Sequence, residues 1–316
     1  MRTSLRNAVV AAMCGAVVLA TATAAVATPA TDVAAEAITC DSKASGKDGP
    51  FYNGPSASYA YDKRFGIGPS VPGLDTHTPQ GIAAWNNWDG ASDLLLVTSY
   101  QDGKDAHIIG IDPKSGKHIG TVAIAESHVG GIAVVRDWAF VQGAGSTIRK
   151  YKLSELKTAM KAGGVPYLKQ DGEARNVYAA SFISSYGNDL YAGKFNDKGR
   201  DKMYRYTVGA DGALTTQEGA YEVPMKTQGL MVTKDHFVYS TSYGNDNRSN
   251  LYVVNAGARD LDKGSPRCFR SPSMSEGIAA YDGYAYVVYE SGSAKYVKEH
   301  PRNVIQNLHK GKISTL

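Results

Sequence analysis

One short pattern recurs along this chain at nearly constant spacing. Each copy begins with a small residue in an apolar run, passes through a turn that contains aspartate, and continues into a second apolar run. The clearest copy starts at Gly229, turns at Asp235 and continues through residues 236–243. The pattern predicts a strand, a tight turn and a second strand, because aspartate suits turns. Five copies align at Gly81, Gly131, Ser181, Gly229 and Gly277.

The steps between the aligned copies are 50, 50, 48 and 48 residues. A fixed period of this length, built from short strands, is typical of β-propeller blades. A small residue suits the innermost strand, because strands crowd around the axis and a missing Cβ permits close approach. We therefore predict an all-β propeller of four-stranded blades, with five blades favoured and six as the alternative. The repeats are expected to start near residues 80, 130, 180, 228 and 276.

The N-terminal residues predict export. Arg2 and Arg6 precede an apolar stretch at residues 8–20, and Ala25-Val26-Ala27 provides small residues for cleavage. These are the parts of a secretory signal peptide, and the apolar stretch is too short to span a bilayer. The division predicted from the sequence is a signal peptide at 1–27, a flexible leader at 28–50 and the propeller at 51–316.

Three segments lie outside the repeat. We expect the stretch before residue 75 to provide an outer strand that closes the ring against the last blade, because an open ring would leave exposed sheet edges. Residues 153–161 have helical spacing and end at Gly163-Gly164, which predicts a short helix inserted on the outside of the second blade. Residues 300–316 are expected to hold a final strand with a polar end.

Charge and cysteine content narrow the possible partners. Removing Arg2 and Arg6 with the signal lowers the formal charge from +4 to about +2. A charge this small gives no basis for binding nucleic acid or an anionic membrane. Cys40 and Cys268 then remain, and in an oxidising compartment we expect them to form one disulfide, with two free thiols as the alternative. The mature protein is expected to be an extracellular or cell-wall-associated monomer without a membrane span.

Propeller topology predicts a site at one end of the channel. The second strand of each blade returns antiparallel to the first, so the start of the first strand and the loop after the second open on one face, called here the upper face. Amides, carboxyl groups and tyrosines converging there are typical of a site for a polar ligand, and two of the tyrosines could stack on a sugar. The alternative is that these groups only satisfy strand ends. The predicted ligand-binding residues are Gln80, Tyr100, Gln228, Tyr243, Glu276 and Glu290.

A catalytic alternative rests on Glu276 and Glu290, which are the only carboxylates at the aligned positions. As a pair they could perform acid–base chemistry or hold a cation. Glu276-Gly277 resembles the Glu-Gly of metal-dependent propeller lactonases, and that resemblance implies a hydrolase. The further Asn and Asp ligands of that family are not matched. The corresponding positions hold Gln80, Gly130, Ser181 and Gln228.

Other catalytic motifs are missing from the sequence. No Gly-x-Ser-x-Gly elbow and no His-x-x-x-His pair occurs, and the two cysteines of the mature chain are assigned to the disulfide. We therefore favour a protein without catalytic residues, cofactor or metal.

In overall character the chain resembles secreted β-propellers of filamentous, high-GC bacteria. The alanine-rich export signal and the Gln-Gly-Ile/Leu and Thr-Ser-Tyr motifs carry the resemblance, over about residues 75–297. It is also similar to the dispase autolysis-inducing proteins, which are extracellular propellers and substrates of microbial transglutaminase. That resemblance implies reactive glutamines at Gln80, Gln101 and Gln228 that are cross-linked into the cell envelope. The leading interpretation is a non-catalytic propeller that binds a protein partner or a glycan through its upper face.

Overall fold

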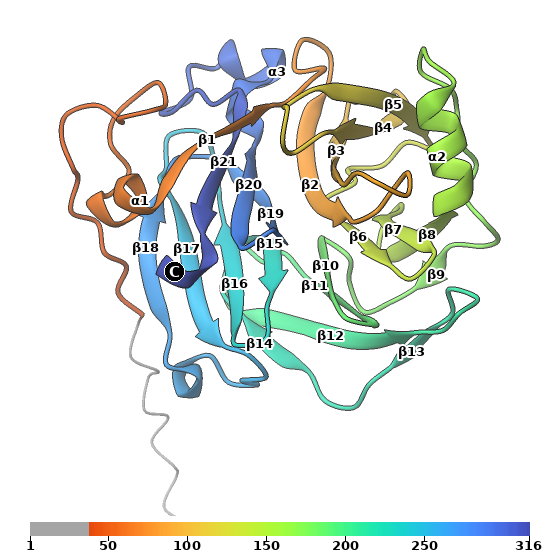
Figure 1. The fold of residues 1–316 in the computed structure, drawn as a ribbon. Helices are drawn as coiled ribbons and strands as arrows, with labels where there is room; N and C mark the ends of the chain where they lie inside the picture. Colours follow the sequence, from red (N-terminus) through yellow and green to blue (C-terminus); the bar gives the residue numbers. More distant parts are fainter. Residues whose placement is uncertain (1–37) are drawn as a thin grey trace, which may run out of the picture. The chain divides into compact units, whose positions relative to one another are not determined.

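Five antiparallel sheets surround a central axis in the computed structural model, which describes residues 38–316 (Figure 1). The predicted signal peptide and residues 28–37 of the predicted leader lie outside the described residues. The first blade contains β2 (Thr78–Trp85), β3 (Leu94–Tyr100), β4 (Ala106–Ile111) and β5 (His118–Ile124). The second contains β6 (Ile132–Val135), β7 (Trp138–Gln142), β8 (Thr147–Lys152) and β9 (Arg175–Asn176).

The other three blades repeat this order with two variations. In the third blade two short strands share the outer position, since both pair with β12. This blade contains β10 (Phe182–Tyr186), β11 (Asp189–Gly193), β12 (Asp201–Val208), β13 (Leu214–Thr216) and β14 (Tyr221–Val223). The fourth contains β15 (Thr227–Val232), β16 (His236–Thr241), β17 (Ser249–Asn255) and β18 (Arg267–Ser271). The fifth contains β19 (Ser275–Tyr281), β20 (Tyr284–Tyr289), β21 (Asn307–Lys312) and β1 (Phe65–Ser70).

The prediction of a five-bladed propeller is confirmed, and the six-bladed alternative is wrong. The core lies between neighbouring blades. In β3, Leu94 and Leu96 pack in a cluster with side chains of the second blade, whereas Leu95 and Val97 pack in a cluster with side chains of the fifth. Alternate side chains of a strand point to opposite faces of its sheet, so a strand between two neighbours is apolar on both faces. This accounts for the uninterrupted apolar run at residues 94–97.

The glycines at the repeat starts allow the inner strands to meet around the axis. A Cβ added to Gly131 would lie 2.2 Å from the backbone nitrogen of Ile183, in the next blade. One added to Gly229 would lie 2.4 Å from the carbonyl oxygen of Glu276, again in the next blade. Real Cβ atoms do not approach backbone atoms this closely, so the predicted reason for these glycines is confirmed.

The ring is closed by joining the two ends of the described chain. Strand β1 pairs antiparallel with β21, with Phe65 opposite Gly311, as the sequence predicted. Helix α1 (Tyr59–Arg64) precedes β1, and the backbone N–H of Tyr61 donates to the Ser58 side chain at its N-terminus (3.1 Å). The buried Tyr61 hydroxyl lies 2.7 Å from His309 Nδ1 on β21. Burial lowers the pKa of His309 to about 3, so this imidazole is neutral in the fold.

A disulfide joins Cys40 to Cys268 with a Cα–Cα distance of 4.3 Å, which confirms the predicted pairing. Cys268 lies in β18, the outer strand of the fourth blade. The N–H of Asp41 donates to the carbonyl of Cys268 (2.8 Å), and the N–H of Arg270 donates to the carbonyl of Asp41 (2.9 Å). The N-terminal arm therefore continues the outer edge of this blade by one backbone bridge.

The predicted inserted helix is α2 (Leu153–Lys161), which directly follows β8. Its buried Met160 packs on β5, where a Cβ added to Gly120 would lie 2.4 Å from the Met160 carbonyl. The remaining helical segments are α3 (Ala294–Val297) and the 3₁₀ turns η1 (Asp262–Gly264), η2 (Glu290–Gly292) and η3 (Ile313–Thr315). No helix within residues 38–316 is long and apolar enough to cross a bilayer.

Candidate functional site

All six residues predicted for the upper face line one cavity of about 490 Å³, called here the upper mouth. Gln80, Gln228 and Glu276 come from the beginnings of three inner strands. Tyr100 ends β3, Tyr243 follows β16, and Glu290 begins the turn after β20. Residues that are up to 210 positions apart in the chain, Gln80 and Glu290, are hydrogen-bonded here. The structure therefore brings the six predicted residues together in one cavity.

Three inner strands have an irregular register at the mouth, and the irregularities lie at the predicted residues. The strand pairing shifts around Gln80 in β2, around Gln228 in β15 and around Glu276 in β19. A bulge adds a residue to one strand and redirects its side chain, and bulges are common beside functional sites. The pairings that begin at β6 and β10 run without a shift. The bulged strand starts of blades one, four and five carry long side chains into the mouth, whereas the strand starts of blades two and three contribute only Gly130 and Ser181.

The deepest group of the upper mouth is the Glu276 carboxyl. Its side chain is only 1% exposed, and its Oε1 has no hydrogen-bond partner among the described residues. Burial and the adjacent Glu290 raise the pKa of Glu276 well above its ordinary value. Burial raises the pKa of Glu290 to about 7, against the opposing effects of the Gln80 amide and the Lys295 ammonium. At neutral pH the pair therefore retains a proton that two exposed glutamates would release.

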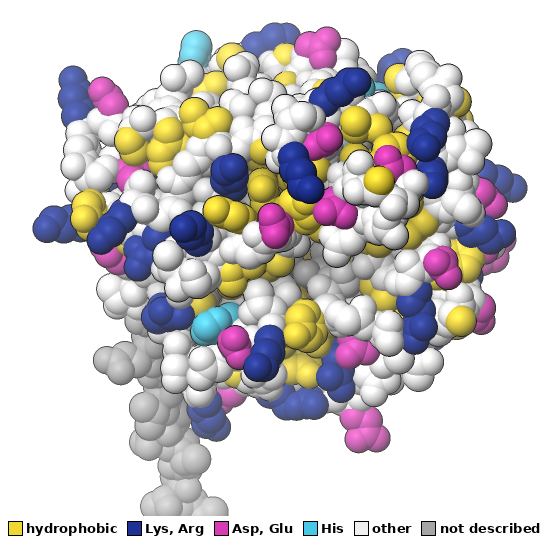
Figure 2. Space-filling view, viewed as in Figure 1, with side chains coloured by type: hydrophobic (Ala, Val, Ile, Leu, Met, Phe, Trp, Pro, Cys, Tyr) yellow, Lys and Arg dark blue, Asp and Glu magenta, His cyan; other side chains and the backbone are white. Residues whose placement is uncertain are grey.

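The lining of the upper mouth is acidic. Three glutamates line it, Glu276, Glu290 and Glu299, and no lysine or arginine does. Lys295 lies beside the mouth, where its ammonium donates to the Tyr100 hydroxyl (3.0 Å) and to Asp102 (3.0 Å). Lys295 is thus paired with Asp102, which does not line the mouth. Elsewhere charges of both signs are mixed, as the face in Figure 2 shows.

The two predicted tyrosines differ in what they can contact. Tyr100 is 4% exposed, and its ring packs on His128 with a centroid distance of 4.3 Å. Little of this ring is therefore open to a ligand, and the binding role of Tyr100 stays a prediction. Tyr243 is 50% exposed and lies nearly parallel to the ring of Phe195, with centroids 6.5 Å apart. Phe195 and Tyr243 form the aromatic rim of the mouth.

Several lining residues were not predicted. Gln142 ends β7, the second strand of blade two, and Phe195 follows β11, the second strand of blade three. The rule that selected Tyr100 and Tyr243 applies equally to these two positions and would have found them. Tyr296 and Glu299 come from the segment around α3, an addition to the fifth blade that the repeat does not contain. No repeat-based rule could have placed them.

The described residues show no cluster of acidic or histidine side chains of the kind that holds a metal ion. Within residues 38–316, no three His, Cys, Asp or Glu side chains gather closely enough to hold a metal ion. The upper mouth combines its carboxyl groups with the amides of Gln80, Gln142 and Gln228 instead. This donor set suits hydrogen bonding to a polar ligand.

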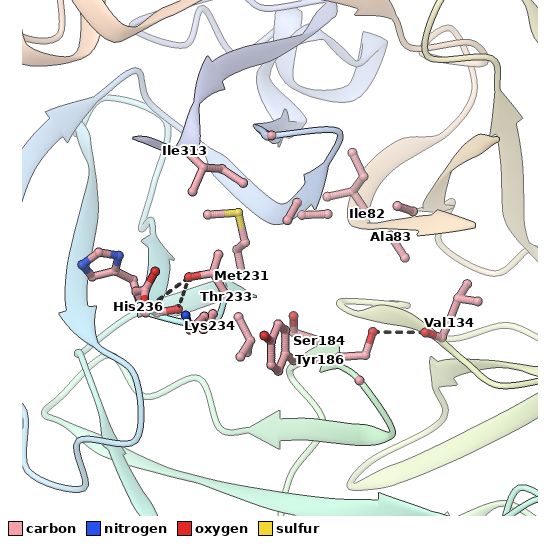
Figure 3. A pocket seen from close by; sticks show the side chains of 18 of the residues that line it. Ile82, Ala83, Val134, Ser184, Tyr186, Met231, Thr233, Lys234, His236 and Ile313 are labelled. Carbon is pink, nitrogen blue, oxygen red and sulfur yellow. Dashed lines mark hydrogen bonds between the residues drawn. The ribbon is translucent and has the colours of Figure 1, made fainter. Parts of the chain in front are cut away.

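A second cavity, of about 810 Å³ and called here the lower mouth, lies at the other ends of the inner strands. Its lining includes apolar side chains such as those of Ile82, Met231 and Ile313, the last from the C-terminal segment (Figure 3). Polar side chains such as Lys234 and His236 lie at the turn between β15 and β16. The sequence analysis did not predict this cavity.

No protein-family model matches the chain, and no curated protein matches it either. Among solved structures, it is similar to Kuenenia stuttgartiensis hydrazine synthase, with 12% identity, coverage of 69% of this chain and 58% of that chain, and a TM-score of 0.41. It is also similar to the nidogen/laminin complex (11% identity, 68% of this chain, 73% of that chain, TM-score 0.39). A third similar structure is the Cps50 (Swd1) β-propeller domain of Myceliophteria thermophila, with 12% identity, coverage of 72% of this chain and 66% of that chain, and a TM-score of 0.38. The chain thus spans less than two thirds of the hydrazine synthase chain. These similarities concern the fold alone, and the blade assignment rests on strand pairing.

Proposed function

We propose that this protein is a secreted, non-catalytic propeller that binds a protein partner or a glycan in its upper mouth. The observation that carries the proposal is the convergence of six residues, chosen from the repeat alone, on one 490 Å³ cavity. The bulged strand starts support it, because three separate blades depart from regular pairing at the residues that enter the mouth. If these polar side chains only satisfied the hydrogen-bonding groups at the strand ends, the strands could pair regularly and would not need the bulges.

The chemistry of the mouth also supports binding. Its exposed part is the rim of Phe195 and Tyr243, and amides and carboxyl groups lie below. Aromatic rings supply contact area at low entropic cost, and amides supply directional hydrogen bonds. A hydrolase acting through Glu276 and Glu290 is the competing function. The feature that favours it is the raised pKa of Glu290, about 7, which would suit a general acid or base.

The experiment compares two tyrosines that are equally exposed at opposite ends of the channel. Tyr243 is 50% and Tyr186 is 47% exposed, and Tyr186 lines the lower mouth. Wild type, Tyr243→Ala and Tyr186→Ala are applied to a glycan array and a peptide array, and their melting temperatures are measured. We expect Tyr243→Ala alone to lose the wild-type signals while all three melt alike. Equal binding by both variants would place the site elsewhere, and a lower melting temperature of Tyr243→Ala with intact binding would make that ring structural.

Cross-linking by a transglutaminase is a second candidate, which follows from the resemblance to extracellular transglutaminase substrates. The three candidate glutamines differ in access. Gln80 is buried and its amide donates to Glu290 and to the Pro79 carbonyl, whereas Gln101 is exposed in the turn after β3. Microbial transglutaminase and dansylcadaverine should therefore label Gln101 and leave Gln80 unlabelled, as peptide mapping would reveal. Undiminished labelling of a Gln101→Asn variant would contradict this assignment.

A further inference from the structure

We propose that the upper mouth captures a primary ammonium group, supplied by a lysine side chain of a protein partner. This inference rests on the proposed binding function and adds the chemistry of the ligand. Three independent features of the mouth lead to it: the sign of its lining charges, the unpartnered Glu276 oxygen, and the depth of that oxygen below the rim.

The lining charges favour a cation. Glu276, Glu290 and Glu299 line the mouth without any lysine or arginine, in a chain whose total formal charge is positive. The acid pair retains a proton at neutral pH, and a ligand that brings its own positive charge can take the place of that proton, whereas a neutral ligand cannot. Low-dielectric walls strengthen this preference, because charge interactions are screened less inside a cavity than in water.

The unpartnered oxygen calls for a hydrogen-bond donor. Glu276 Oε1 is buried in the mouth, and no group among residues 38–316 donates to it. Leaving a buried polar atom unsatisfied destabilises the fold, so such atoms are uncommon without a reason. An ammonium carries three donors and can serve Glu276 and Glu290 together. A hydroxyl carries one donor and no charge.

Depth distinguishes a lysine from an amino sugar. Glu276 is nearly inaccessible, whereas the rim residue Tyr243 is half exposed. A four-carbon lysine stem can pass between the rim and the carboxyls and keep its apolar carbons against aromatic rings. An amine attached directly to a sugar ring cannot reach as far below the ring. The chain already shows the matching contact at the rim, where Lys226 Nζ lies 4.6 Å from the Tyr243 ring centroid.

The acid pair makes this capture sensitive to pH. Protons and an ammonium compete for the same carboxyls, so affinity should rise with pH as Glu290 ionises. The other groups facing the pair do not reverse this. Burial lowers the pKa of His128 and raises the pKa of Tyr100 to about 12, and the pKa values of Tyr296 and Lys295 are also raised. Asp102 and Glu299 add negative charge, and a free lysine amine stays protonated until about pH 10.

The test uses small probes and a matched carboxylate. Nα-acetyl-lysine N-methylamide and its Nε-acetylated analogue are titrated by NMR into wild type, Glu276→Gln and Glu218→Gln. Glu218 is exposed and does not line the mouth, so its substitution changes the same charge elsewhere. At about pH 8 we expect the amine to bind at least about tenfold more tightly than its acetylated analogue. Glu276→Gln should lose this difference and Glu218→Gln should keep it. At about pH 5.5 wild type should bind the amine several-fold more weakly than at pH 8.

Several outcomes would overturn the inference. One is equal binding of the amine and its acetylated analogue, another is no binding of either probe, and a third is retention of the difference in Glu276→Gln. Glucosamine binding more tightly than the lysine probe would replace the lysine with an amino sugar. If the array ligands still depend on Tyr243 while neither amine binds, the proposed function stands and this inference fails. Melting temperatures of all three proteins verify that they are folded.

Discussion

The same five inner strands form both mouths of the channel, yet the two mouths differ in chemistry. At the upper mouth three of these strands, β2, β15 and β19, begin with bulges that carry Gln80, Gln228 and Glu276. At the lower mouth four of the strands end in turns of two or three residues, and β2 ends in the longer connection 86–93. Apolar side chains such as Met231 and Ile82 line the cavity together with polar side chains of the turns, such as Lys234. At the upper mouth the converging polar side chains come from the bulged strand starts and from the segment around α3, so the two ends of one strand can present different chemistry.

The largest expected effect is a loss of stability on truncating Met231, a side chain that lines the lower mouth. Met231 is 1% exposed and packs in a cluster with side chains of β17, β18 and β19, whereas Met225 is 41% exposed in the turn before β15. Met231→Ala should lower the free energy of unfolding by about 2–5 kcal/mol, because it leaves a cavity in close packing. Met225→Ala should change it by less than about 0.5 kcal/mol. Urea titration of both variants measures the contrast, and equal, small losses would show that the lower mouth is not part of the core.

At the upper mouth a substitution should increase the free energy of unfolding, in contrast to Met231→Ala. The pKa of Glu276 is raised in the fold, so the folded protein binds a proton that the unfolded chain releases above about pH 4.5. The wild-type carboxyl therefore costs stability increasingly as pH rises from 4.5 through neutrality. Glu276→Gln removes the titrating group and should raise the free energy of unfolding at about pH 7 by about 1–3 kcal/mol. Little change is expected at about pH 4, where the carboxyl is protonated in both states.

Glu218→Gln is the matched control, because it removes an exposed carboxylate, and it should leave stability unchanged at both pH values. His309 changes stability with pH in the opposite sense to Glu276 and serves as an internal reference. Its lowered pKa, about 3, makes stability fall as pH drops below the ordinary histidine value, since the unfolded chain then takes up a proton first. A Glu276→Gln variant less stable than wild type at neutral pH would mean that the carboxyl makes a stabilising interaction there.

The repeat predicted much of this molecule because its physical cause is local. Gly131 and Gly229 mark positions where backbones of neighbouring blades come close, and the residue before each repeat glycine lines the upper mouth. Packing between distant segments could not be predicted in the same way. The burial of Tyr100 depends on His128 and Lys295, which come from other parts of the chain. The lower mouth likewise depends on how the C-terminal segment lies across the inner strands, and no motif marks that arrangement.

Chelation should have the smallest effect on stability. It tests whether the upper mouth binds a metal ion. No three metal-ligating side chains of His, Cys, Asp or Glu gather within residues 38–316, so EDTA should not change the melting temperature and added Ca²⁺ should not raise it. A lactonase-like site predicts the reverse, because a metal bound only to the folded state stabilises it. Glu276→Gln measured beside wild type locates any effect. A melting temperature that EDTA lowers in wild type and not in Glu276→Gln would identify a cation held in the upper mouth by carboxyl and amide oxygens. That result would favour the hydrolase over the binding protein, and it would replace the ammonium with a metal as the partner of the acid pair.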